Sequence, residues 1–133
     1  MAYRYKYFPP EYAKEFKLLK ECQNLSGDIF AASASAKKEY RFTLLKKMHD
    51  LCCELVHSVN IANAYQVGTK DRMEEQKRVA DLLLRIDELL PVLRRCRCIS
   101  LGQEGEITKK IGNIKISYEK WVESDMKRIG RDV

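Results

Sequence analysis

The side chains best suited to covalent chemistry or metal binding are the thiols and imidazoles. They are Cys22, Cys52, Cys53, Cys96, Cys98, His49 and His57. Cys53 and His57 are four residues apart, a spacing that places two side chains on one face of a helix and allows a thiolate–imidazole pair. Both lie in an apolar stretch, however, where cysteine behaves as a small hydrophobic residue. We therefore expect buried thiols and a protein that is not an enzyme.

The spacing of these residues is not that of a metal or cofactor site. The odd number of cysteines and the lack of a CxxC pair argue against a disulfide framework and a zinc site. The paired Glu-x-x-His motifs of a di-iron bundle do not occur, and neither does an HExxH motif or a glycine-rich phosphate loop. We expect no metal, no cofactor, and free thiols in a reducing compartment.

Apolar residues recur at helical spacing along most of the chain. In residues 41–63 one row contains Leu44, Met48, Leu51, Leu55, Val59 and Ala62. A second row, Leu45, Cys52 and Val56, lies beside the first and makes the stripe wider than a two-stranded coiled-coil seam. We expect these three residues and Trp121 to be anchors of the core or of an oligomer interface.

Four helices are predicted, and they indicate one all-α domain. We expect helices from about Pro10 to 32, over 37–65, over 70–98, and from after Gly102 to 129. Pro91 is expected to kink the third helix. Short connectors favour an antiparallel up-down-up-down four-helix bundle over residues 10–129. An extended aromatic and basic arm is predicted at 1–9, and a tail at 130–133.

The chain is moderately basic. It has 25 Lys and Arg against 19 Asp and Glu, a formal net charge of +6, which favours a polyanionic partner. Candidate phosphate contacts lie at the start of the second helix, at the end of the third and on the fourth: Lys37, Lys38, Arg41, Lys46, Lys47, Arg94, Arg95, Arg97, Lys109 and Lys110. No acid follows the three arginines until Glu104. The alternative for them is that, as cations at a helix C-terminus, they complement the helix dipole.

The sequence predicts a cytoplasmic protein without a membrane partner. The first ten residues, MAYRYKYFPP, lack the apolar segment of a signal peptide. No apolar run approaches the roughly 20 residues that span a bilayer.

An ordered set of short motifs resembles a known family. The motifs are Arg41-Phe42-Thr43-Leu44, Ile61-Ala62-Asn63, Leu89 with Leu93-Arg94-Arg95, Ile99-Ser100, Lys110-Ile111-Gly112 and Trp121. Over about residues 11–125 the chain resembles the accessory variability determinant (Avd) proteins of diversity-generating retroelements. It is also similar to the wider four-helix-bundle family that includes proteins encoded in 23S rRNA intervening sequences.

This resemblance implies a homopentameric barrel of four-helix bundles. It also implies a non-catalytic accessory protein that binds RNA or other nucleic acid and associates with the retroelement reverse transcriptase, supporting cDNA synthesis in mutagenic retrohoming. The chain is less basic than expected of such a protein, and Pro91 interrupts the third helix. The alternative is therefore a structural or protein-interaction bundle of the intervening-sequence type, without strong nucleic-acid binding.

Overall fold

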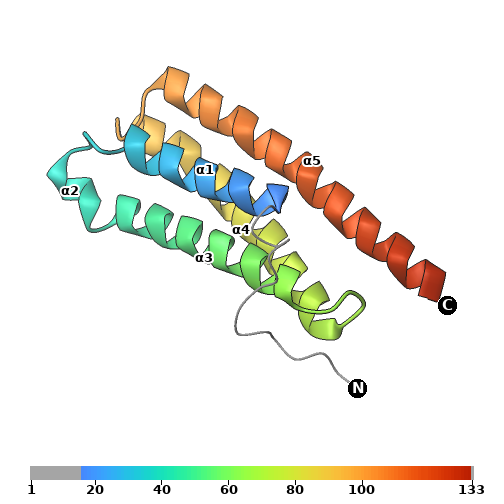
Figure 1. Ribbon diagram of the computed structural model, residues 1–133. Coiled ribbons are helices and arrows are strands. Elements are labelled where there is room, and N and C mark those ends of the chain that lie inside the picture. Colours follow the sequence, from blue (N-terminus) through green and yellow to red (C-terminus); the bar gives the residue numbers. More distant parts are fainter. Residues whose placement is uncertain (1–15, 133) are drawn as a thin grey trace.

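The computed structural model describes residues 16–132, and over this range the only regular structure is helical. A one-turn helix and four long helices follow one another: α1 (Lys17–Ala32), α2 (Lys38–Arg41), α3 (Leu44–Ala64), α4 (Lys70–Arg95) and α5 (Leu101–Asp132). The long helices alternate in direction, and each packs against two others, in the order α1, α3, α4, α5 and back to α1 (Figure 1).

The all-α fold predicted from the sequence is confirmed for the described residues, and its arrangement is that of a four-helix bundle. The structure contains a single chain, so the pentamer stays a prediction. The predicted arm at 1–9 and the start of the first helix near Pro10 lie outside the described residues. Within residues 16–132, no helix is both long enough and apolar enough to cross a membrane.

One continuous apolar cluster fills the space between the four long helices. Each helix contributes residues at steps of three and four, as the apolar stripes predict. Its largest fully buried members include Leu25, Ile29, Met48, Leu55, Ile86, Leu90, Leu93, Ile111 and Ile114. Burying each such side chain stabilises the fold by about 1.5–3 kcal/mol.

The second predicted helix, over 37–65, is wrong as a single element. The chain leaves helical geometry at Thr43 (φ −120°, ψ −92°), and α2 is a separate turn before α3. After the break, α2 packs beside the start of α3, at the same end of the bundle as the α4–α5 turn (Figure 1). Cys96 lies close to the phenol of Tyr40 and raises the pKa of that phenol above its ordinary value.

Pro91 lies inside α4, which continues through it to Arg95 as expected, and the kink at Pro91 stays a prediction. Proline lacks the N–H that would complete one helical bond, and its ring here is exposed. The helix ends three residues before the expected Cys98. Its end is a Schellman motif, in which the Cys98 N–H donates to the Leu93 carbonyl (2.8 Å) and the Arg97 N–H to the Arg94 carbonyl (2.9 Å).

Helix α5 begins at Leu101, so the turn expected over 99–102 is shorter than predicted. Ser100 and Gln103 form a capping box. The Ser100 hydroxyl oxygen accepts from the Gln103 N–H (3.1 Å), and the Gln103 side-chain oxygen accepts from the Ser100 N–H (2.9 Å). At its other end α5 runs to Asp132, past the expected boundary at residue 129.

Candidate nucleic-acid interface

Two groups of predicted phosphate contacts that are far apart in the sequence meet at one end of the bundle. Helix α2, the start of α3, the end of α4 and the start of α5 all lie at this end (Figure 1). We call it the basic end and define it by Lys37, Lys38, Arg41, Lys46, Lys47, Arg94, Arg95 and Arg97. The antiparallel order of the helices produces this grouping, because the α1–α3 connection and the α4–α5 turn fall on the same side.

Two of these eight cations are paired with acids. The Lys46 ammonium lies 2.9 Å from Asp50 Oδ2, and Arg94 Nε lies 2.6 Å from Glu104 Oε1. The other six side chains are exposed and have no ion-pair partner within residues 16–132: Lys37, Lys38, Arg41, Lys47, Arg95 and Arg97. Exposed cations without acids are the groups that neutralise phosphates at a protein surface.

Arg94 is held in place rather than free. Glu104 lies one turn into α5, so the tight α4–α5 turn brings its carboxylate back to the end of α4. The contact uses only Nε, so the two terminal nitrogens of the guanidinium remain available as donors. The pairing of Arg94 with Glu104 could not be predicted from the sequence, because the two residues are ten positions apart.

Lys109 and Lys110 do not belong to the basic end. Both lie more than two turns into α5. Lys110 pairs with Asp28 and so joins α5 to α1 along the side of the bundle. Lys109 is exposed, with no ion-pair partner among the described residues.

The four predicted anchors lie mostly within this chain's own core. Leu45 is 3% exposed and Cys52 is fully buried; burial raises the pKa of the Cys52 thiol to about 12. Trp121 is buried between the rings of Phe16 and Tyr118, at centroid distances of 5.4 and 6.2 Å. Val56 is half-buried and lines a shallow apolar groove between α1 and α3. Leu45 and Cys52 therefore leave no surface for a second subunit.

The expectation that all cysteines are buried is wrong for Cys53, whose side chain is exposed on α3, and Cys96 is only half-buried. His57 is also exposed, and no hydrogen bond joins it to Cys53 in the described chain. Among the residues that the structure describes, no group of three His, Cys, Asp or Glu side chains could hold a metal ion.

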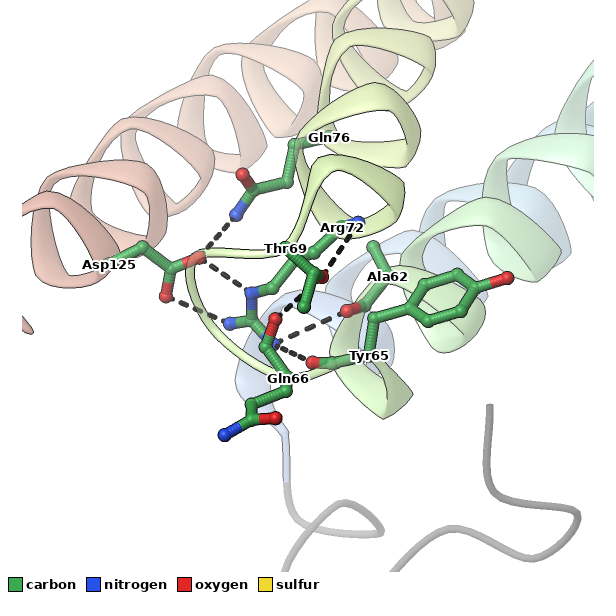
Figure 2. Close-up of polar contacts among 7 residues, drawn as sticks. All are labelled: Ala62, Tyr65, Gln66, Thr69, Arg72, Gln76 and Asp125. Atoms are coloured by element: carbon green, nitrogen blue, oxygen red, sulfur yellow. Dashed lines mark hydrogen bonds and ion pairs between the residues drawn. The ribbon is translucent and has the colours of Figure 1, made fainter. Parts of the chain in front are cut away.

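The opposite end of the bundle contains a buried polar network that sequence reasoning missed. Arg72 forms a bidentate pair with Asp125, with Nε 2.6 Å from Oδ2 and Nη2 2.9 Å from Oδ1 (Figure 2). The Gln76 amide also donates to Asp125 Oδ2, at 2.7 Å. All three residues are at most 6% exposed. We call Arg72, Gln76 and Asp125 the buried triad.

The buried triad also closes the end of α3. Arg72 Nη1 donates to the main-chain carbonyls of Ala62 (3.3 Å) and Tyr65 (2.9 Å) at the end of α3, where the Ala62 carbonyl also accepts from the Tyr65 N–H (3.3 Å) (Figure 2). The guanidinium carbon lies 5.3 Å from the centroid of the Trp121 ring. Through these bonds the triad joins α3, α4 and α5. Every member is hydrogen-bonded and buried, so the triad has no free polar group exposed to a substrate.

A sequence signal for this triad did exist. Arg72 and Gln76 continue the row of α4 core residues Val79, Leu83, Ile86, Leu90 and Leu93 at steps of four and three. Asp125 likewise continues the α5 row through Tyr118 and Trp121. Polar residues on two apolar stripes predict burial with a partner, because an unpaired buried charge is costly.

Comparisons with known proteins assign the chain to no family. No protein-family model matches it, and the search of curated proteins found no matching protein. A function is therefore inferred from the charge and geometry of the basic end, together with the resemblance of the sequence motifs.

Proposed function

We propose that the protein is a non-catalytic accessory protein that binds RNA through its basic end. The observation that supports this most directly is the grouping of six exposed cations at α2, the start of α3 and the end of α4, none of which has an ion-pair partner among the described residues. The resemblance to Avd proteins supplies the context of the proposal. In that context the protein is part of a diversity-generating retroelement, assembles as a pentamer, and associates with the reverse transcriptase to support cDNA synthesis and mutagenic retrohoming.

The proposed binding is electrostatic and does not read base sequence. Lysine and arginine neutralise backbone phosphates and release counterions, which gives affinity without contacts to base edges. If all six cations contact a single strand, the logarithm of the binding constant should fall with the logarithm of the salt concentration with a slope of about −4.

A matched pair of variants tests this proposal. In the first, the six unpaired cations of the basic end are replaced by glutamine. In the second, six exposed cations spread along the bundle are replaced by glutamine: Lys17, Lys20, Lys77, Lys109, Lys120 and Arg128. Both variants lose the same net charge. Fluorescence anisotropy with a labelled RNA across a salt series should show loss of affinity and a flatter slope mainly in the first variant. Equal losses in both would contradict an interface at the basic end.

The alternative function is a structural or protein-interaction bundle of the intervening-sequence type. It is favoured by the balanced charge along the sides of the bundle, where cations pair with acids of neighbouring helices. Examples are Arg78 with Glu54 at 3.8 Å and Lys115 with Asp87 at 3.3 Å. Absence of RNA binding at low salt would select this alternative.

The pentamer and the reverse transcriptase are tested separately. Light scattering should give a mass near five times the 15.5 kDa of the chain and no change on dilution. A monomer would contradict the barrel. An adjacent reverse-transcriptase gene with a template and variable repeat would support the retroelement context, and its absence would count against it.

A further inference from the structure

A solvent-open pocket of about 440 Å³ lies at the basic end, between the end of α1 and the α4–α5 turn. Its lining combines cationic, hydroxyl and apolar side chains, among them Ser35, Arg94, Arg97, Ile99, Ser100 and Leu101. No carboxylate of the described chain lines it. Its volume lies in the usual range of small-ligand sites, about 300–1,000 Å³. Its size and charge therefore suit a compact anion.

Arg97 occupies a position where the backbone favours glycine. It is the left-handed residue of the Schellman motif, with φ +61°, and it is the only non-glycine residue with positive φ in the described chain. Glycine adopts this conformation without the steric strain that a Cβ brings. The capping geometry therefore explains the conformation but not the choice of arginine. Arg97 is exposed and lines the pocket, which gives a reason for the choice of a cationic side chain there.

Hydrogen bonds within the protein hold two other donors of the pocket, Arg94 and Ser100, in position before a ligand binds. Glu104 holds Arg94 through Nε alone, which leaves both terminal nitrogens free to donate. The Ser100 oxygen accepts from the Gln103 N–H, so its own proton remains available to donate. Together with Arg97 and the exposed Ser35 hydroxyl, these groups can serve more acceptor oxygens than a single carboxylate offers.

We infer that this pocket binds a phosphate monoester carried by the 5′ end of an RNA strand, an inference that rests on the proposed RNA-binding function. A terminal phosphate carries a charge of about −1.5 to −2 at pH 7 and three acceptor oxygens, which matches two arginines and two hydroxyls. The side chain of Leu101 is 71% exposed beside the arginines and offers an apolar surface to the first nucleoside.

The pocket and the open surface of the basic end suit different phosphates of an RNA strand: the pocket suits a terminal phosphate, and the open surface suits internal ones. An internal phosphodiester is flanked by sugars on both sides, so it suits the exposed cations of α2 and Arg95 on the open surface. A terminal phosphate can enter the pocket, whose lining brings Arg94, Arg97 and the Ser35 and Ser100 hydroxyls to one place. The pocket therefore adds a preference for strand ends to the general affinity of the basic end.

The test uses the full chain and two RNA strands of one sequence, labelled at the 3′ end and carrying either a 5′-phosphate or a 5′-hydroxyl. Anisotropy should show about tenfold tighter binding of the phosphorylated strand. Arg97→Gly should remove most of this preference. That variant suits the left-handed backbone, so circular dichroism and thermal unfolding should show a folded protein with a raised melting temperature.

Arg95→Gln is the matched control, because Arg95 is exposed at the same helix end but does not line the pocket. It should weaken binding of both strands and leave their ratio unchanged. Equal binding of the two strands by the unmodified protein would overturn the inference and leave the proposed function standing.

A second measurement separates the inference from the proposed function. Calorimetry with adenosine 5′-monophosphate, with adenosine as the control, reports on the pocket without an RNA chain. Binding of the nucleotide alone, without any RNA binding, would overturn the proposed function and keep the phosphate assignment of the pocket. Binding of neither nucleotide nor RNA would overturn both.

Discussion

The two ends of the bundle use arginine in opposite ways. At the α3–α4 turn, Arg72 is 5% exposed, and its guanidinium is bonded to Asp125 and to two main-chain carbonyls. At the α4–α5 turn, Arg95 and Arg97 are exposed with no ion-pair partner in the described chain. Local sequence alone does not set this difference. The difference depends on whether a neighbouring helix supplies a buried acid, as α5 does through Asp125. An arginine with such a partner stabilises the fold, and an arginine without one is available to a ligand.

Removing the acid of the buried triad should have the largest effect on stability. In Asp125→Ala, Arg72 would stay buried without its counter-charge, and we expect the free energy of unfolding to fall by about 3–5 kcal/mol. Urea unfolding followed by circular dichroism measures this. Asp81→Ala is the control, since it breaks only an exposed pair with Arg85 (2.8 Å) and should cost less than about 1 kcal/mol. A loss below about 1 kcal/mol in Asp125→Ala would show that the triad does not stabilise this end.

A companion variant distinguishes charge pairing from packing. Replacing Arg72 by Met and Asp125 by Leu together removes the desolvation cost of both charges while keeping side-chain volume. Such replacements of buried pairs are often neutral or stabilising. We expect the double variant to be clearly more stable than Asp125→Ala. Equal stability of the two would indicate that the capping of the α3 carbonyls by Arg72 dominates.

Alkaline pH should destabilise the core that lies between the two ends. Burial raises the pKa of the Cys22 and Cys52 thiols from 9.0 to about 12. The unfolded chain therefore loses these protons first, so the stability is fully present below pH 9 and is lost as the pH rises towards 12. Each thiol should contribute a fall of about 1.4 kcal/mol per pH unit in this window. Urea midpoints at pH 8, 9 and 10 test this, and Cys52→Ala should reduce the slope. Comparisons of RNA binding at the basic end are thus best made below pH 9.

Helix-terminal substitutions at the two ends should change stability in opposite directions. Thr69 Oγ1 accepts from the Arg72 N–H at 3.3 Å and caps α4, so Thr69→Ala should cost about 1 kcal/mol. Arg97→Gly should instead stabilise the fold by about 1 kcal/mol, because it removes the strain of a left-handed non-glycine residue. Thermal unfolding of both variants checks the signs. Destabilisation by Arg97→Gly would mean that the arginine side chain supports the fold.

The helices could be predicted from the sequence because their apolar stripes extend over many turns. The core positions Met48, Leu55, Ile86 and Ile111 all lie on the expected faces. The break at Thr43 could not be predicted, because no glycine or proline marks it in the sequence. The continuation of α4 through Pro91 was predictable, because the apolar spacing continues to Leu93 beyond the proline.

The candidate site was predictable in its residue types but not in its grouping. The two basic clusters were visible as separate charge runs, and only the antiparallel order of the helices places them at one end. Pairing decided which cations remain free: Glu104 engages Arg94 and Asp28 engages Lys110, each from a different helix. The left-handed backbone of Arg97 could not be predicted, because a Schellman motif is usually marked in the sequence by glycine and this one has arginine in its place.

The smallest effect that still separates the two ends comes from Asp50, which pairs with Lys46 on the exposed surface of α3. Asp50→Asn should change stability by less than about 0.5 kcal/mol, because exposed i,i+4 pairs contribute little. It should nevertheless tighten RNA binding by about twofold at low salt, since it removes a negative charge and releases Lys46 at the basic end. Asp81→Asn makes the same change on the side of the bundle and should leave RNA affinity unchanged. If both variants gained affinity equally, net charge rather than the basic end would control binding. A gain confined to Asp50→Asn would place the phosphates near the start of α3.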